Sequence, residues 1–227
     1  MKIAELFYSI QGEGLLAGIP SVFIRTSGCN LRCAWCDTPY TSWAPEGEEL
    51  SLNRILDYVE EHSTGYVVIT GGEPMIMTGI TGLTQSLHAM DQHITVETAG
   101  TVYAPVECDL MSISPKLSNS TPRDREGGRW APRHDQLRIQ PGVLLRLAAE
   151  YEYQLKFVVA SPEDLAEIQA LARMVGAPPD RVLLMPEGVD AATLRERAVW
   201  LTEICKQEGF RYCPRLHIEL YGHRRGV

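Results

Sequence analysis

The chain has 227 residues, of which 44% are hydrophobic and 22% are charged, and this composition excludes wholesale disorder. Its net charge of −8 argues against non-specific nucleic-acid binding, although a local basic pocket can still hold a small anionic ligand. There is no signal-peptide core and no apolar run near the roughly 18 residues of a membrane span. We therefore expect a soluble, cytoplasmic protein with neither a nucleic-acid nor a membrane partner.

Short β-branched runs alternate with helical patterns along the chain, which predicts an α/β fold with a mostly parallel sheet. Most of these runs are continuously apolar, as in strands that are covered on both faces. The expected strands are, in chain order, Lys2–Tyr8, Ser21–Thr26, Tyr66–Thr70, His93–Glu97, Asp109–Ile113, Gln154–Val159, Arg181–Met185 and Arg215–Leu220.

Helix signals lie between the expected strands. Ser51–Glu61 begins with a capping serine and carries its apolar residues on one stripe. Ser161 begins a second helix, since a proline and two acids follow it directly. A third helix begins at Asp190 and is stopped by Gly209. Weaker helical patterns cover Gly79–Met90 and Val143–Tyr151.

Residues Ser114–Asp135 form an irregular region, rich in Pro, Gly, Ser and Arg, for which we expect a lid or binding loop without regular structure. We expect one domain over residues 1–227. The strand count approaches that of an eight-stranded barrel, but the chain is shorter than the ~250 residues typical of that fold. A partial or distorted (β/α) barrel fits better, with the chemistry at the carboxyl ends of the strands.

Three of the six cysteines lie close together, in the pattern Cys-x-x-x-Cys-x-x-Cys after the strand expected at Ser21–Thr26. These are Cys29, Cys33 and Cys36. Thiolates suit iron–sulfur clusters and zinc, and three on one loop can hold a cubane while leaving one iron open. A structural zinc site normally has a second pair of ligands, which we do not find. The other cysteines, which we expect to have no role in the site, are Cys108, Cys205 and Cys213.

A second motif, Thr70-Gly71-Gly72-Glu73-Pro74, follows the strand expected at Tyr66–Thr70. Adjacent glycines at a strand end permit a ligand to approach the backbone closely. Alone, a Gly-Gly pair is more often a plain turn. Both motifs nevertheless lie where a barrel-like fold places its site.

Together the two motifs resemble those of the radical S-adenosylmethionine (SAM) superfamily. The resemblance implies that the three clustered cysteines hold a 4Fe–4S cluster. It also implies that SAM chelates the open iron and that Gly71-Gly72 faces the SAM amino group. In this superfamily, one-electron cleavage of SAM yields a 5′-deoxyadenosyl radical that abstracts hydrogen from the substrate, while the protein orients and shields it.

A longer set of matches resembles one family in this superfamily, the 7-carboxy-7-deazaguanine synthases. That family converts 6-carboxy-5,6,7,8-tetrahydropterin into 7-carboxy-7-deazaguanine with loss of ammonia, in queuosine and 7-deazapurine biosynthesis. The resemblance implies a carbon–nitrogen lyase that uses Mg²⁺, is reduced by a flavodoxin or ferredoxin, and forms a homodimer. The matching segments are Phe7–Gly14, Gly18, Pro20, Phe23–Arg25, Cys36–Tyr40, Glu97-Thr98, Ser114–Lys116, Leu216-His217, Gly222 and Arg225–Val227.

The same resemblance assigns individual residues to the ligands. The substrate contacts it implies are Ile10, Gln11, Gly12, Glu13, Arg25 and Thr70. The SAM contacts it implies are Trp35, Cys36, Asp37, Gly72, Glu97, Ser114, Pro115, Lys116, Gln154 and Lys156. Thr38 matches the Mg²⁺ ligand of the family, with Asp37 as the alternative.

The side-chain chemistry suits these assignments, yet each residue also has a structural alternative. Gln11 and Glu13 can pair with the edge of a pterin, but the segment also fits a polar turn. Arg25 offers a planar fork for a carboxylate, but it also fits a surface ion pair. A hydroxyl such as that of Thr38 can bind a hard cation, but a threonine there also fits a helix cap. His217 can line the pocket or serve the structure alone.

Two other functions remain open at this point. A radical SAM activase of a glycyl-radical enzyme needs a protein-docking surface, whereas this chain concentrates small-ligand polar groups before Arg25. A non-catalytic iron–sulfur sensor has no use for the Gly-Gly motif. Ala99 departs from the family, which often has asparagine there, and this leaves the ribose contacts near Glu97 in doubt.

Overall fold

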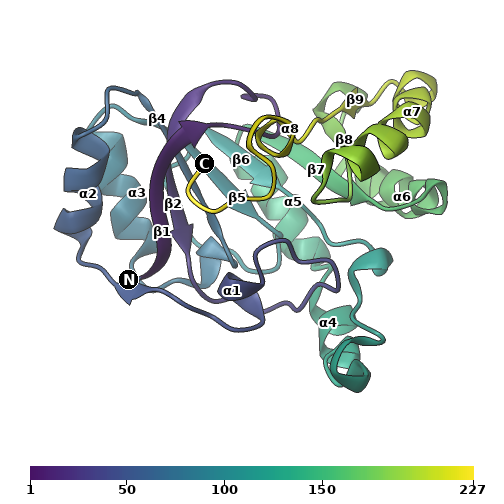
Figure 1. Cartoon of the computed structure of the whole chain (residues 1–227), viewed down its shortest axis with the longest axis horizontal. Coiled ribbons are helices and arrows are strands. Elements are labelled where there is room, and N and C mark those ends of the chain that lie inside the picture. Colours follow the sequence, from purple (N-terminus) through teal and green to yellow (C-terminus); the bar gives the residue numbers. More distant parts are fainter.

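The computed structural model describes residues 1–227 and contains one nine-stranded open sheet, in the order β3-β1-β2-β4-β5-β6-β7-β8-β9 (Figure 1). The strands from β2 through β4 to β9 are parallel, while β1 runs antiparallel to both β2 and β3. The expected α/β fold with a mostly parallel, unclosed sheet is confirmed. The strands are β1 (Lys2–Ile10), β2 (Pro20–Thr26), β3 (Glu48–Glu49), β4 (Tyr66–Gly71), β5 (His93–Thr98), β6 (Leu110–Ile113), β7 (Tyr153–Val159), β8 (Val182–Pro186) and β9 (Arg211–Tyr212).

The helices predicted from the sequence are present with ends close to the predicted ones, while those at Pro39–Ser42 and Ala131–Leu137 were not predicted. The Ser51 side chain caps one helix by accepting from the Arg54 amide, and Asp190 caps another. Gly209 ends that second helix in the left-handed conformation, with φ of 72°. The α-helices are α1 (Pro39–Ser42), α2 (Leu52–Glu60), α3 (Ile80–Ala89), α4 (Ala131–Leu137), α5 (Pro141–Glu150), α6 (Leu165–Val175), α7 (Ala191–Glu208) and α8 (Leu216–Tyr221). None of them is long and apolar enough to cross a membrane.

The two faces of the sheet differ in chemistry because side chains alternate along each strand. On one face, apolar residues such as Ile24, Ile69 and Phe157 join a core of 30 buried residues with α2, α3, α5, α6 and α7. The neighbouring residues in the same strands, such as Arg25 and Thr70, point to the opposite face. The strands therefore present polar groups to a concave surface that the helices leave uncovered.

Two structural predictions made from the sequence are wrong. Residues Arg215–Leu220 form helix α8 and not a strand, with Ile218 buried and Leu220 57% exposed. Leu216, Ile218 and Leu220 alternate as in a strand, and six residues are too few for the helical period to show. The Ser114–Asp135 region also has more structure than expected, because it contains two 3₁₀ turns and the start of α4.

Candidate active site

A cavity of about 480 Å³ opens on the concave face, at the carboxyl ends of the parallel strands. Most of the predicted site residues line it together, although they come from segments far apart in the chain. These residues are Ile10, Gln11, Gly12, Glu13, Arg25, Cys29, Cys33, Trp35, Cys36, Asp37, Thr38, Thr70, Gly72, Glu97, Ser114, Lys116 and Lys156. The chain's C-terminal segment, which passes in front of β5 and β6 in Figure 1, adds Arg225 and Val227 to the lining.

Two predicted SAM contacts, Pro115 and Gln154, do not line this cavity. Gln154 is buried, and its amide donates to Ser112 and accepts from the backbone of Leu15. The residue therefore holds the loop after β1 against the sheet. Its prediction as a SAM contact rested on the family resemblance, whereas these hydrogen bonds give it a structural role.

The cysteine loop (Gly28–Thr38) follows β2 and brings all three clustered thiols to the cavity. No disulfide joins them, and burial raises the pKa of Cys29 to about 12 and the pKa of Cys33 as well. A residue beyond the loop holds it in place, since the Trp43 indole donates to the Cys33 carbonyl at 3.0 Å. Three sulfurs around one wall suit a cubane, in which each thiolate binds a different iron. The residues present therefore fit a 4Fe–4S cluster.

The Gly-Gly motif lies directly against the cysteine loop. A Cβ at Gly72 would overlap the Gly28 carbonyl, and a Cβ at Gly71, whose φ is +126°, would overlap the backbone of Thr26. The Glu73 amide also donates to the Gly28 carbonyl at 2.9 Å. Only glycine permits this approach of two strand ends, which sets the motif beside Cys29.

Glu73 is a structural residue that the sequence analysis did not single out. Its carboxylate is fully buried and accepts from the Thr98 hydroxyl at 2.7 Å and from the Ala99 amide at 2.8 Å. Burial raises the pKa of Glu73, and these hydrogen bonds oppose the shift. The side chain joins the end of β4 to the end of β5, so the backbone at Ala99 is held although its side chain is small.

A buried charge cluster forms the wall opposite the cysteine loop. The Lys156 ammonium lies 2.5 Å from Glu13 Oε2, and Arg215 Nε donates to Glu13 Oε1 at 3.1 Å. Burial acts to raise the pKa of Glu13, but the two cations hold it well below its usual range. Glu13 is therefore a carboxylate at neutral pH, able to accept hydrogen bonds from a ligand.

Glu97, which the family resemblance assigns to SAM, contacts residues that the resemblance assigns to the substrate. It accepts from the Thr70 hydroxyl at 2.7 Å and from the Gln11 amide at 3.3 Å, and it lies 3.6 Å from the Lys156 ammonium. Gln11 is buried, and its Oε1 accepts from the Glu13 amide. These polar groups form one connected wall, and the contact between the Glu13 amide and Gln11 shows that the segment also makes a local polar turn.

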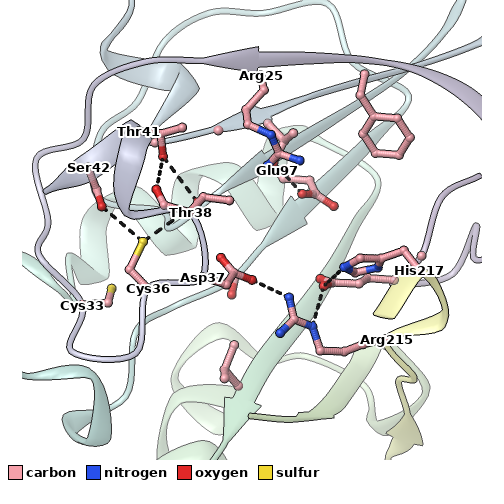
Figure 2. A pocket seen from close by; sticks show the side chains of 18 of the residues that line it. Arg25, Cys33, Cys36, Asp37, Thr38, Thr41, Ser42, Glu97, Arg215 and His217 are labelled. Carbon is pink, nitrogen blue, oxygen red and sulfur yellow. Dashed lines mark hydrogen bonds and ion pairs between the residues drawn. The ribbon is translucent and has the colours of Figure 1, made fainter. Parts of the chain in front are cut away.

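Arg25 points into the cavity from β2, as Figure 2 shows. Its Nε lies 2.7 Å from Glu5 Oε2 without the alignment of a hydrogen bond, and its guanidinium carbon lies 5.3 Å from the Phe7 ring centre. The ion pair that the sequence left as an alternative is thus present. It uses one edge of the guanidinium, and the side chain still faces the cavity.

Thr38 occupies the N-cap position of α1 but makes no capping hydrogen bond. Its Oγ1 lies 3.4 Å from the Thr41 hydroxyl and 3.9 Å from Cys36 Sγ (Figure 2). Asp37 is bonded to Arg215, and the guanidinium holds its pKa below the usual range although burial acts to raise it. Both candidate cation ligands line the cavity, Thr38 with contacts to Thr41 and Cys36 and Asp37 with one of its two carboxylate oxygens bonded to Arg215.

Three residues at the site were missed or set aside by the sequence analysis. Arg215, read as part of a strand, bonds both Glu13 and Asp37. His217 lines the cavity 4.0 Å from Glu13 and packs against Gly12, and burial lowers its pKa. The Cys213 thiol, expected to be a bystander, accepts from the Gly14 amide at 3.1 Å. Their partners lie about 200 positions away in the chain, so no local pattern reveals them.

Comparisons with known proteins agree with this architecture. Residues 23–116 match the family model described as the radical SAM superfamily. The chain is 44% identical to a 7-carboxy-7-deazaguanine synthase of Rhodopirellula baltica, over 100% of this chain and 89% of the relative. It is 45% identical to that of Halobacterium salinarum, over 97% and 90%.

Among solved structures, the crystal structure of QueE from Escherichia coli aligns with a TM-score of 0.68. It covers 93% of this chain and 92% of that chain at 24% sequence identity, which supports the fold. The two relatives, which match over almost their full length, show the family as well as the fold. The chain belongs to the 7-carboxy-7-deazaguanine synthase family of radical SAM enzymes.

Proposed function

We propose that this chain converts 6-carboxy-5,6,7,8-tetrahydropterin into 7-carboxy-7-deazaguanine with loss of ammonia. The observation that carries the proposal is the cavity itself, in which the cysteine loop faces a connected polar wall of Gln11, Glu13 and Glu97. The full-length relatives bear the name of that synthase. When bound, the cluster and SAM supply one-electron cleavage and a radical that abstracts hydrogen from the substrate.

The cysteine loop and the Gly-Gly motif form the cofactor side of the site. Cys29, Cys33 and Cys36 hold the cluster. Gly72 lets the motif lie against the cysteine loop, because a Cβ there would overlap the Gly28 carbonyl, and it lines the cavity where SAM is proposed to bind. Ser114 and Lys116, which are hydrogen-bonded at 2.8 Å, lie at the same side of the cavity and provide donors for SAM. Trp35, whose indole is fixed by Asn119, shields the pocket.

The substrate lies against the opposite wall. Arg25 holds the substrate carboxylate by its free edge, because a guanidinium forms paired hydrogen bonds with a carboxylate. Gln11, Glu13 and Glu97 read the donors and acceptors along the pterin edge, and Thr70 fixes the orientation of Glu97. The Glu13 and Glu97 carboxylates, 13% and 21% exposed, disfavour a ligand that presents only acceptors.

We propose Thr38 as a ligand of Mg²⁺, because its hydroxyl faces the cavity and caps no helix. Substrate and water oxygens complete the coordination of such a hard cation. We also propose a homodimer, a flavodoxin or ferredoxin as reductant, and a cytoplasmic location. These three proposals rest on the family resemblance and on the reduced cysteines that a cluster needs.

Anaerobic reconstitution with iron and sulfide tests the cofactor part of the proposal. We expect a 4Fe–4S absorption and EPR spectrum that is lost in Cys29→Ala, Cys33→Ala and Cys36→Ala and kept in the control Cys205→Ala, whose thiol is in the core. We also expect the holo-protein to cleave SAM under reduction. Bound zinc without an iron signal contradicts the assignment, and cluster without SAM cleavage supports the sensor alternative. Hydrogen abstraction from a protein glycine supports the activase.

A further inference from the structure

We propose that Arg215 is a positioning residue. It fixes the substrate wall, formed by Gln11, Glu13 and Glu97, relative to the cysteine loop. This inference rests on the proposed function and adds a role for a residue at the start of α8. The side chain spans the gap between the two sides of the cavity, as Figure 2 shows for Arg215 and Asp37. Its function is to set where the substrate lies with respect to the radical source.

The guanidinium makes three different contacts with its three nitrogens. Nε donates to Glu13 on the substrate wall, and Nη2 donates to Asp37, next to the cluster ligand Cys36. Nη1 donates to the Gly188 carbonyl at 2.6 Å, in the loop after β8. The third contact ties both carboxylates to the frame of the sheet, so neither side of the cavity can shift independently.

Burial makes this arrangement rigid. The Arg215 side chain is 6% exposed and that of Glu13 is 13% exposed, so water competes little for this pair, while the Asp37 side chain is 37% exposed. Lys156 also pairs with Glu13, but Arg215 is the cation that pairs with Asp37 among the ion pairs of the chain. Without Arg215, two carboxylates that repel each other would face one cavity.

Two further contacts of the C-terminal segment repeat the same connection. The Leu216 amide donates to the Gly12 carbonyl at 2.9 Å, and the His223 ring lies 3.0 Å from the Asp37 carbonyl. The segment therefore contacts both sides of the cavity twice, once through Arg215 and once through Leu216 on the Gly12 side or His223 on the Asp37 side. An arginine is required for the side-chain contact, because a lysine has one nitrogen and cannot span three acceptors.

The test compares Arg215→Gln and Arg215→Lys with wild type and with Arg146→Gln, whose arginine pairs with Glu150 on the surface of α5. The measurement is 5′-deoxyadenosine formed per 7-carboxy-7-deazaguanine, with reconstituted enzyme and saturating SAM. If the substrate is misplaced in the cavity, SAM is cleaved without formation of the deazapurine product. We expect the ratio to rise by about 10- to 100-fold in both Arg215 variants, as for other residues that orient a ligand-binding group. Arg146→Gln keeps the wild-type ratio.

Cluster absorbance and the melting temperature show whether each variant is folded and loaded. If Arg215→Gln does not fold, the double variant Arg215→Gln/Asp37→Asn removes the unpaired charge and serves in its place, with the same expected ratio. A wild-type ratio in folded, cluster-loaded Arg215→Gln, Arg215→Lys or the double variant overturns the positioning role. If wild type itself cleaves SAM but forms no deazapurine, the proposed function fails instead, so the two failures are distinguishable.

Discussion

Lys156 in β7 and Glu13 in the loop after β1 form a buried ion pair, 2.5 Å between Nζ and Oε2, across 143 positions of the chain. The side chains are 6% and 13% exposed. Glu13 and Glu97 raise the pKa of Lys156, although burial acts to lower it. The pair fixes the loop that carries Gln11 and Gly12 to the centre of the sheet, so it serves both the fold and the substrate wall.

Removing the cation of this pair should destabilise the fold. We expect Lys156→Ala to lower the free energy of unfolding by about 3 kcal/mol, because Glu13 and Glu97 keep their buried charges with one partner fewer. The control Lys206→Ala removes an exposed pair with Glu203 and should change stability by less than about 1 kcal/mol. Urea unfolding measures both. Equal effects of the two substitutions contradict the structural role of the pair.

Arg25 should contribute to substrate binding and not to cluster content. We expect Arg25→Ala to raise the KM for the carboxytetrahydropterin by about 10- to 100-fold, since charge-assisted hydrogen bonds are worth roughly 1.5–3 kcal/mol. Steady-state kinetics measure the KM, and absorbance measures cluster content. Arg54→Ala, which removes an exposed arginine on α2, is the matched control. A loss of cluster in Arg25→Ala shows that Arg25 has a different role.

Thr38 should control the response to Mg²⁺. We expect Thr38→Ser to keep the stimulation of activity by Mg²⁺ and Thr38→Val to lose it, because valine keeps the shape but removes the oxygen. The melting temperature should stay the same in both, since Thr38 makes no capping hydrogen bond. Wild-type Mg²⁺ stimulation in Thr38→Val assigns the metal to another oxygen. A loss of about 1 kcal/mol of stability reveals a cap instead.

His134 should make the stability of the fold depend on pH. Burial is the main reason that its pKa is lowered to about 4, and its Nδ1 accepts from the Arg32 amide in the cysteine loop. The unfolded chain binds a proton near the ordinary pKa of 6.5, while the folded chain does so near 4. The stabilisation is thus complete above about pH 6.5 and is lost as the pH falls towards 4.

The variant His134→Gln isolates this contribution, because an amide can accept from Arg32 and donate to Ser120 without titrating in this range. Chemical unfolding from pH 7 to pH 4 measures the difference between wild type and variant. We expect wild type to lose more stability, by about 2–3 kcal/mol. Parallel pH dependence of the two proteins shows that the pKa of His134 is the same in the folded and the unfolded chain.

The sequence predicted the strands and the cysteine loop of the site better than the contacts between residues that are distant in the chain. The strand at Tyr66–Thr70 was predicted nearly to the residue, because a continuous apolar run identifies a buried parallel strand, and the strand at Gln154–Val159 was predicted within one residue. The cysteine loop was placed correctly at a strand end. By contrast, α8 was predicted as a strand, since a one-and-a-half-turn helix has too few residues to show its period.

The contacts that organise the cavity were beyond the sequence for a physical reason. Arg215 meets Glu13 and Asp37 only because α8 returns across the sheet, and ion pairs 178 and 202 positions apart leave no periodic signal. Likewise, the role of Glu97 beside Thr70 follows from the register of β4 and β5. Residue types at a strand end indicated chemistry, but the pairing between strands decides which group each one faces.

The most direct test incubates reduced holo-protein with SAM, Mg²⁺ and 6-carboxy-5,6,7,8-tetrahydropterin without oxygen and follows the products by mass spectrometry. We expect 7-carboxy-7-deazaguanine and ammonia to form together, and both to disappear in Cys33→Ala. Cleavage of SAM to 5′-deoxyadenosine with no deazapurine formed, under conditions in which the cluster is intact, contradicts the account.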